Sequence, residues 1–425
     1  MQFHSRFLYL CYVFFAINSL AIGQDWTRFR GPNGTGVGKG KAVPSQWTEA
    51  DYNWKVELPG IGHSSPVVWG DKVFLLSADP ETATRFVICI NAKDGSKNWV
   101  CEYPSEPHHL HTRSSFASST PAVDEERVYM AWSTPKETTL KAFDHSGKEV
   151  WSKNLGRWQS QHGFGTSPIV FEDLLILHNS QQASQLKEGE EPGESTMMAF
   201  NRKTGMEVWS VPLESANVCY SVPFIYQPEK GPPELVCTST GNGMFSLDPH
   251  TGKTNWALND GLFEMRTVAS PIAVAGLIFG STGSGAYASN YIVAVRPGKN
   301  PEVKYKLKND SKFKAPYVPC YVAQDDLVFF IYDKGFASCV DAATGKIYWN
   351  ERVPGNFSGS PVRVDDRIFI IDEDGIVFVL AADKQFKILA RNELGEPSRS
   401  TPAVSGGRLY LRTYSHLISI GDKSP

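Results

Sequence analysis

Residues 65–99 read SPVVWGDKVFLLSADPETATRFVICINAKDGSKNW, and this stretch holds the pattern that decides the fold. After the Ser-Pro start come two apolar runs, Val67 to Trp69 and Lys72 to Ser77, divided by a Gly-Asp turn. A third apolar run ends in the turn Asn91 to Gly95, and a fourth run carries Trp99. Short apolar runs divided by Gly, Asp and Asn indicate β-strands joined by tight turns.

The same pattern recurs along most of the chain at intervals of roughly 40 to 55 residues, the length of a four-stranded propeller blade. Its starts are Ser65-Pro66, Thr120-Pro121, Ser167-Pro168, Val222-Pro223, Ser270-Pro271, Val318-Pro319, Ser360-Pro361 and Thr401-Pro402. The last unit ends after three strands, whereas Asp51 to Leu58 reads as a Trp-bearing fourth strand with no strands before it. We therefore expect an all-β, eight-bladed β-propeller of four-stranded antiparallel blades, its ring closed by this N-terminal strand joining the last blade.

Tryptophan recurs in the fourth strand of the units, at Trp54, Trp99, Trp151, Trp209, Trp256 and Trp349. A wide apolar ring with one N–H can fill the wedge between two sheets while the N–H reaches a carbonyl. We expect these residues to be structural spacers between neighbouring blades. The Asp, Asn and Gly of the turns have a local explanation, because they hydrogen-bond their own backbone or adopt positive φ.

The first residues have a different composition. An apolar run from Phe7 to Ala21 follows Arg6, and small residues precede Gln24, which predicts a secretory signal peptide over residues 1–23 that is cleaved after Gly23. A membrane anchor is the alternative, but the run is short and no basic cluster follows it. We expect a secreted or periplasmic protein without a transmembrane anchor after cleavage, with an N-terminal segment at 24–50 and one propeller domain at 51–425.

Composition and charge narrow the function. The chain of 425 residues has a formal net charge of −3, which provides no bulk positive field for a nucleic-acid partner. Six of its seven cysteines lie beyond the leader. Cys89 and Cys101 lie symmetrically about the Asp94-Gly95 turn and could form a disulfide in an oxidising compartment. Six buried free thiols are the alternative, because cysteine packs well in β-sheet cores.

Residues just before each first strand of a propeller rim one mouth of its central channel. Here these candidates for ligand or cofactor binding are His63, His162, Tyr220, Arg266, Lys314, Asn356 and Arg399. Several cations in one funnel could bind an acidic ligand or the carboxylates of a quinone. The alternative is that these side chains satisfy backbone groups and water around a wet channel.

A histidine cluster, His108, His109 and His111, precedes Arg113 in the loop between the first two units. Neutral imidazoles bind zinc or copper, so the cluster is a candidate metal site. A solvated loop is the alternative, because adjacent residues of an extended segment point to opposite sides. The acidic insert at 180–194 reads as a solvated excursion from the third unit.

With the repeat, the turn-Gly-Trp signature and the leader together, the chain resembles the PQQ-like β-propeller family over nearly all of its mature length. Residues Trp26 to Gly34 and His162 to Pro168 are similar to segments of secreted bacterial propellers that carry this repeat. The family includes quinoprotein dehydrogenases, which use pyrroloquinoline quinone with calcium, and the non-enzymatic outer-membrane assembly protein BamB. The dehydrogenases carry two adjacent cysteines, and no such pair occurs in this sequence.

The sequence thus favours a non-catalytic, monomeric binding or scaffold protein that uses its channel mouth and inter-blade loops. No catalytic residue is assigned, and the ligand class stays open between a protein, a small molecule and a glycan. One alternative is a PQQ-dependent alcohol or sugar dehydrogenase, which implies PQQ and calcium as cofactors. The other is a BamB-like assembly factor, which implies a protein partner.

Overall fold

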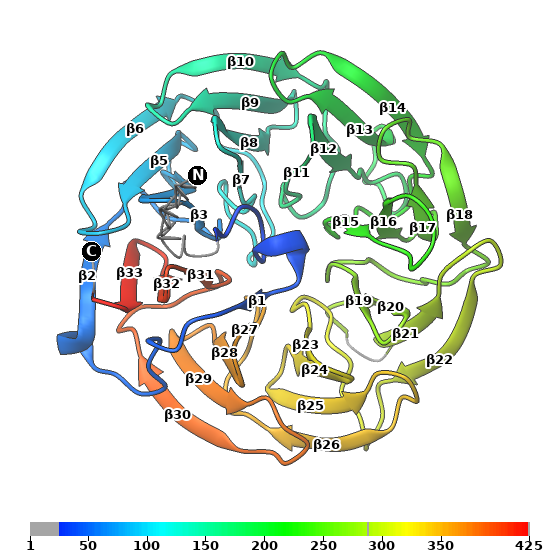
Figure 1. The fold of residues 1–425 in the computed structure, drawn as a ribbon. Helices are drawn as coiled ribbons and strands as arrows, with labels where there is room; N and C mark the ends of the chain where they lie inside the picture. Colours follow the sequence, from blue (N-terminus) through cyan, green and yellow to red (C-terminus); the bar gives the residue numbers. More distant parts are fainter. Residues whose placement is uncertain (1–24, 287–288, 424–425) are drawn as a thin grey trace, which may run out of the picture.

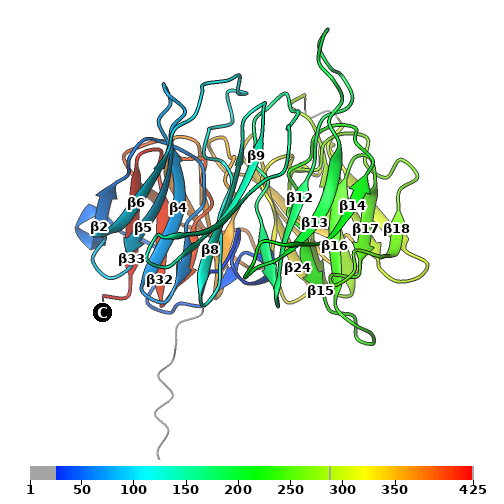
Figure 2. The same cartoon turned by 90° about the horizontal axis from the view of Figure 1, so that it is seen from above.

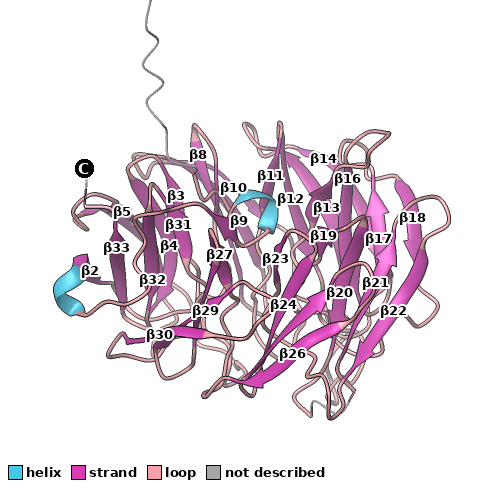
Figure 3. Cartoon of the chain, turned by 60° about the horizontal axis from the view of Figure 1, so that its bottom comes forward, coloured by secondary structure: helices cyan, strands magenta, loops and turns pink. Residues whose placement is uncertain are grey.

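The computed structural model describes residues 25–286 and 289–423, so the predicted signal peptide lies outside the described residues. Eight sheets stand around a central axis like the blades of a propeller (Figure 1), which confirms the predicted fold class. Helix in the described residues is limited to two short 3-10 turns, η1 (Pro32–Gly34) and η2 (Glu49–Asp51), drawn in cyan in Figure 3. Neither turn is long and apolar enough to cross a membrane.

The blades are numbered here in chain order. Blade 1 holds β3 (Val67–Trp69), β4 (Lys72–Ala78), β5 (Arg85–Asn91) and β6 (Lys97–Tyr103). Blade 2 holds β7 (Ala122–Val123), β8 (Arg127–Ser133), β9 (Thr138–Asp144) and β10 (Glu149–Asn154). Blade 3 holds β11 (Ile169–Phe171), β12 (Leu174–Asn179), β13 (Ser195–Asn201) and β14 (Glu207–Leu213). Blade 4 holds β15 (Phe224–Tyr226), β16 (Glu234–Ser239), β17 (Gly243–Leu247) and β18 (Thr254–Leu258).

The second half of the ring follows the same order. Blade 5 holds β19 (Ile272–Val274), β20 (Leu277–Thr282), β21 (Tyr291–Arg296) and β22 (Glu302–Lys308). Blade 6 holds β23 (Val322–Gln324), β24 (Leu327–Tyr332), β25 (Phe336–Asp341) and β26 (Ile347–Arg352). Blade 7 holds β27 (Val362–Val364), β28 (Arg367–Ile371), β29 (Ile376–Ala381) and β30 (Ile388–Glu393), and β1 (Val37–Gly38) pairs parallel with β27. Blade 8 holds β31 (Ala403–Ser405), β32 (Arg408–Arg412), β33 (His416–Gly421) and β2 (Tyr52–Glu57).

The two chain ends meet in blade 8, as predicted. Strand β2 pairs antiparallel with β33, placing Lys55 opposite Ile418 and Glu57 opposite His416. Figure 1 shows the blue β2 outside the red β33. Because the outermost strand of the last blade comes from the start of the ring, the closure joins the blades into one circle.

The predicted start of the sixth unit, Val318-Pro319, is wrong by two residues. Strand β23 begins at Val322, directly after Cys320-Tyr321, whereas β3 begins directly after Ser65-Pro66. The proline signal misleads here because Pro319 lies in the connecting loop, so Cys320 occupies the place that a serine or threonine holds in most other blades.

These start residues form hydrogen bonds from blade to blade around the channel. Each backbone N–H donates to the side chain of the start residue in the next blade: Ser65 to Thr120 Oγ1 (3.1 Å), Thr120 to Ser167 Oγ (3.0 Å), Val222 to Ser270 Oγ (3.0 Å), Ser270 to Cys320 Sγ (3.1 Å), Cys320 to Ser360 Oγ (3.0 Å), Ser360 to Thr401 Oγ1 (2.9 Å) and Thr401 to Ser65 Oγ (3.2 Å). The circle is interrupted at Val222, which has no hydroxyl. The repeated Ser/Thr therefore satisfies a buried N–H of the preceding blade.

The fourth-strand tryptophans join each blade to the next. The indole N–H donates across the blade boundary from Trp54 to Ala92 O, Trp99 to His145 O, Trp151 to Arg202 O, Trp209 to Pro249 O and Trp349 to Asp383 O, each at 3.0 Å. Trp256 differs, since its N–H donates to Glu234 Oε2 of its own blade at 2.7 Å. In blade 5 a tyrosine, Tyr305, takes this place and donates to Ala342 O of blade 6.

The turn glycines are needed for this contact as well as for positive φ. A Cβ added to Gly147 would lie 2.7 Å from Trp99 Cδ2, and one added to Gly205 would lie 2.7 Å from Trp151 Cδ2. Real Cβ contacts are longer, so the indole ring needs a bare glycine beneath it. The turn Gly of one blade and the Trp of the preceding blade therefore pack against each other.

The possible disulfide between Cys89 and Cys101 is absent, because both are free thiols in the structure. Strand register gives the reason: Cys89 lies opposite Trp99, and Cys101 lies opposite Val87. The turn that joins β5 and β6 is centred closer to β5 than the positions of the two cysteines suggested. A bulge also shifts the register between Cys89 and Ile90. The two sulfur-bearing residues are thus diagonal rather than directly paired.

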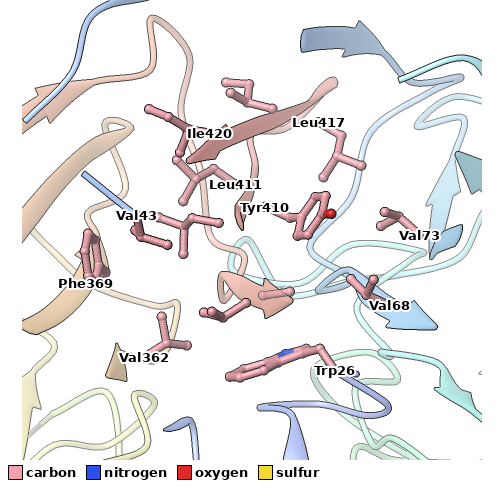
Figure 4. Close-up of a cluster of buried hydrophobic side chains, with 14 of the residues drawn as sticks. Trp26, Val43, Val68, Val73, Val362, Phe369, Tyr410, Leu411, Leu417 and Ile420 are labelled. Carbon is pink, nitrogen blue, oxygen red and sulfur yellow. The ribbon is translucent and has the colours of Figure 1, made fainter. Parts of the chain in front are cut away.

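The N-terminal segment, residues 25–50, packs on the ring. Trp26 is fully buried and exchanges backbone hydrogen bonds with Val68 of blade 1. Figure 4 shows Trp26 and Val43 among apolar side chains of blades 7, 8 and 1, including Phe369 and Tyr410. The sequence left the placement of this segment open, and apolar burial at the last blade junction answers the question.

Beyond Trp26 this segment crosses the axis of the ring, as the dark blue chain in Figure 1 shows. Arg28 donates to Pro223 O of blade 4 at 2.7 Å, and Arg30 donates to Tyr321 O of blade 6. The segment then reaches blade 7 through β1. In the side view of Figure 2 it lies at one face of the ring, while long loops rise from the opposite face. One end of the channel is therefore crossed by the chain itself.

Candidate functional site

The channel holds a cavity of about 530 Å³. Phe29 of the N-terminal segment lines the cavity on the side that this segment crosses. Nearly all other wall residues come from the start residues of the blades and from the loops that precede them, and Gly285 comes from the loop between β20 and β21. The N-terminal segment thus contributes to the wall at one end of the channel, and the loops of the opposite face contribute at the other end (Figure 2).

The structure brings together most of the predicted rim residues. His63, His162, Tyr220, Arg266 and Arg399 all line the cavity. The other two candidates lie outside it. Lys314 Nζ donates to Asp310 O within its own exposed loop at 2.6 Å, and the carbonyl of Asn356 accepts the N–H of Glu373 at 2.8 Å.

The three predicted metal ligands do not converge. His111 lines the channel cavity, where its ring lies 4.9 Å from that of His162. His108 and His109 line a separate pocket of about 140 Å³. Residues 25–286 and 289–423 contain no group of three His, Cys, Asp or Glu side chains placed to hold a metal ion. The loop therefore places His111 in one cavity and His108 and His109 in another.

The same loop, residues 104–118, crosses the mouth of the cavity, and we call it the strap. The His111 N–H donates to His162 O in front of blade 3 at 3.2 Å. Arg399, in front of blade 8, donates to Thr112 O at 2.6 Å. Arg113 Nη1 lies 3.7 Å from a carboxylate oxygen of Asp333 in blade 6. The strap leaves the ring between blades 1 and 2, so its contact with blade 6 spans the channel.

Arg113, Tyr317 and Asp333 are site residues that the sequence did not assign. Arg113 and Tyr317 line the cavity, and Asp333 lies directly behind its wall. The available signal for Arg113 was its place two residues after the histidine cluster. Asp333 follows β24 inside a turn, and nothing local in the sequence distinguishes it from a turn aspartate.

The charged side chains that line the cavity are cationic. Three guanidinium groups line it, those of Arg113, Arg266 and Arg399, and no described Asp or Glu side chain does. Arg266 is 6% exposed; its Nη2 donates to Gln161 Oε1 at 3.1 Å, whereas its buried Nε has no hydrogen-bond partner. Arg399 also lies 3.3 Å from Glu373. Arg266 therefore brings a guanidinium group to the wall, and its Nε is one of several buried arginine Nε atoms without a hydrogen-bond partner among the described residues.

Two imidazoles of the wall are neutral at physiological pH. Burial, reinforced by Arg412 and Arg399, lowers the pKa of His63 to about 3. Burial together with Arg266 lowers the pKa of His162 to about 4. Both rings can therefore offer one N–H donor and one acceptor without adding charge.

The fit of the wall to the cofactors of quinoproteins is mixed. Arginine is the side chain that best matches carboxylate groups, so the acidic groups of a quinone suit Arg113, Arg266 and Arg399. Calcium prefers six to eight oxygen ligands, with carboxylates among them. The described wall supplies no carboxylate, and hydroxyls such as those of Thr120 and Thr401 already accept N–H groups of the blade circle. Calcium does not fit this donor set.

Comparison with known structures places the fold among large propellers. BamB from Moraxella catarrhalis is 15% identical, with 88% of this chain and 99% of that chain covered and a TM-score of 0.59. A quinohemoprotein alcohol dehydrogenase from Comamonas testosteroni is 13% identical, covering 94% and 80%, with a TM-score of 0.66. A europium-containing methanol dehydrogenase is 13% identical, covering 92% and 90%, with a TM-score of 0.63. At these identities the likeness shows the fold alone.

Among curated proteins, a tetrathionate hydrolase from Acidithiobacillus ferrooxidans is 23% identical over 256 residues. The match covers 57% of this chain and 46% of the hydrolase, so the chain spans about half the length of this relative. A family model described as "Outer membrane protein assembly factor BamB" matches residues 136–299 and 312–413, more than half of the chain. The protein therefore belongs to this family of PQQ-like, BamB-like β-propellers.

Proposed function

We propose that this protein is a secreted or periplasmic binding protein that holds an anionic small molecule in its channel without transforming it. The observation that carries the proposal is the wall of the channel cavity, which Arg113, Arg266 and Arg399 line together and no described carboxylate lines. The three residues come from the strap, the loop before blade 5 and the loop before blade 8. A rigid ring holds these loops apart at little entropic cost to binding.

The size and chemistry of the cavity suit a small ligand. Its volume of about 530 Å³ lies within the range of small-molecule sites. Phe29 and Tyr220 supply apolar surface, and the guanidinium groups supply charged donors in a region shielded from water. The curated relative is named for tetrathionate, and tetrathionate is an anion, which agrees with this class of ligand.

The first test is calorimetric titration of the mature protein with m-benzenedisulfonate, a small aromatic dianion. We expect saturable binding that weakens as salt is added, and no binding of the neutral m-benzenedisulfonamide. A hydrogen bond to a charged group contributes about 1.5–3 kcal/mol, so Arg266→Gln should weaken binding by roughly 10- to 100-fold. Arg296→Gln, at an exposed position of β21, is the matched control. Equal binding of the neutral compound would contradict the proposal.

A quinoprotein dehydrogenase is the enzymatic alternative, and its own titration separates it from a binding protein. Pyrroloquinoline quinone carries several carboxylates, so we expect it to compete with m-benzenedisulfonate for the arginines. Because calcium does not fit the wall, calcium should leave this competition unchanged, and no dye should be reduced with alcohols or sugars. Calcium-dependent turnover would replace the binding proposal with the dehydrogenase.

The description of the matched family favours a second candidate, a role in outer-membrane protein assembly. This role needs a docking surface for a protein partner, for which the strap and the insert at 180–194 are the available loops. Gentle extraction from membranes followed by affinity purification checks it. Recovery of an assembly complex that is lost when the insert is shortened would support this role, whereas recovery of the protein alone would count against it.

A further inference from the structure

Asp333 is a buried carboxylate immediately behind the cavity wall. Its side chain is 0% exposed. One oxygen accepts the N–H of Tyr317 at 2.7 Å, and the other accepts the N–H of Val318 at 3.2 Å. Tyr317 and Val318 both line the cavity, so one layer of chain separates this carboxylate from the cavity.

Arg113 stands between this carboxylate and the cavity. Its guanidinium lines the cavity, its side chain is 26% exposed, and its Nη1 lies 3.7 Å from Asp333 Oδ1. Charge-assisted hydrogen bonds are about 2.7–2.9 Å long, and the buried pair of Arg202 and Asp124 in blades 3 and 2 is as close as 2.5 Å. The contact between Arg113 and Asp333 is therefore an ion pair that is longer than a charge-assisted hydrogen bond.

We infer that Asp333 is a positioning residue that controls the affinity of the cavity for anions, because a bound anion takes the guanidinium of Arg113 while Asp333 accepts a proton. This inference rests on the proposed function. An anion in the cavity offers Arg113 a short, charge-assisted contact that Asp333 does not provide. Once Arg113 turns to the anion, the buried carboxylate of Asp333 loses the nearby positive charge. An unpaired negative charge is costly in a region of low dielectric constant.

The charges around Asp333 agree with this exchange. Burial raises the pKa of Asp333 to about 6, although the N–H groups of Tyr317 and Val318 and the charge of Arg113 act in the opposite direction. Loss of the Arg113 contact removes one of these opposing effects and moves the pKa further up, toward neutral pH.

The other titratable groups near this pair stay uncharged at neutral pH. Tyr317 faces both Asp333 and Arg113, and burial raises the pKa of its phenol. His111 faces Arg113, and burial together with that arginine lowers the pKa of its imidazole. Asp333 is thus the group of this cluster that gains a proton when the anion binds, and the proton comes from solvent.

The test is titration calorimetry with m-benzenedisulfonate in buffers of different ionisation enthalpy. This probe stays doubly charged between pH 6 and pH 8 by its chemistry, so protons taken up on binding belong to the protein. We expect uptake of about half a proton between pH 6 and pH 7, with affinity falling several-fold from pH 6 to pH 8. D333N should remove this uptake and bind the probe about tenfold more tightly than wild type at pH 8.

E373Q is the matched control, because it neutralises the carboxylate beside Arg399 and leaves Asp333 in place. It should keep the proton uptake. R113Q provides a second route should D333N fold poorly: it should weaken binding and abolish the uptake, because no guanidinium is left to exchange. Circular dichroism checks the fold of each variant.

The outcomes separate the two proposals. If the wild-type protein does not bind the probe, the proposed function fails and this inference falls with it. If it binds the probe without proton uptake, or if D333N keeps the uptake, the proposed function stands and the role of Asp333 is overturned.

Discussion

Substitution of Gly205 by alanine tests the contact that joins one blade to the next. Gly205 has φ +70°, and an added Cβ would lie 2.7 Å from Trp151 Cδ2. Gly276 provides the matched control, because it has φ +74° and no atom within 4 Å of an added Cβ. The two substitutions share the same backbone strain and differ in the contact with the indole ring.

The expected magnitudes follow from these two effects. Alanine in the left-handed region costs about 1–2 kcal/mol, and Gly276→Ala should lose this amount of unfolding free energy. Gly205→Ala must also displace the Trp151 ring, and such overpacking costs about 1–3 kcal/mol more. We therefore expect Gly205→Ala to lose about 2–5 kcal/mol, always more than Gly276→Ala.

Urea denaturation followed by far-ultraviolet circular dichroism measures both losses without relying on tryptophan emission. The slopes of the two transitions must agree for the free energies to be compared. The extra loss in Gly205→Ala should disappear in a Trp151→Ala background, because the clashing ring is then gone. Equal losses in the two glycine variants, or an extra loss that survives without the ring, would refute the explanation of the repeated Gly and Trp.

Three further predictions follow from the blade circle, a buried imidazole and the cysteines. Thr401→Val should cost about 1–3 kcal/mol in urea denaturation, because the buried N–H of Ser360 then loses its acceptor. Burial lowers the pKa of His178 to about 4, below its unfolded value near 6.5, so the unfolded chain binds the proton first. This imidazole should lower the stability by up to about 1.4 kcal/mol per pH unit from pH 6.5 toward pH 4, and His63 and His162 should add to the fall that denaturation at pH 7 and pH 5 measures. Mass spectrometry after unfolding and alkylation without reductant should find Cys89 and Cys101 fully alkylated, whereas a protected pair would show that a disulfide forms.

The fold could be read from the sequence because its signals are local. Most blades show a start, two turns and a fourth-strand aromatic ring in their own sequence, and none of these signals requires knowledge of distant residues. The failure at Val318-Pro319 has the same origin, since a Pro in a connecting loop looks like a Pro at a strand start. The Cys89 and Cys101 prediction failed because sequence symmetry about a turn does not reveal a bulge.

The candidate site was only partly predictable. Propeller geometry indicated which loops face the channel, and five of the seven proposed rim residues line the cavity. The ion pair of Arg113 and Asp333 could not be found this way, because its members meet across the channel from blades that are distant in the chain. The position of Phe29 was equally hidden, since the path of the N-terminal segment depends on where Trp26 finds an apolar site.

The contacts that hold the ring together and the charges of the site come from different residues, and this difference explains why a shared fold says little about function. The contacts that hold the blades together, such as Trp151 on Gly205 and Ser360 on Thr401, lie between blades or at the starts of strands. The charges of the cavity come from connecting loops, which can change without disturbing those contacts. In this chain the N-terminal segment crosses one end of the channel and the strap crosses the other. A ligand that enters beside the strap meets Arg113, which already has a carboxylate partner, so the exchange of that partner is the step on which the proposed selective binding depends.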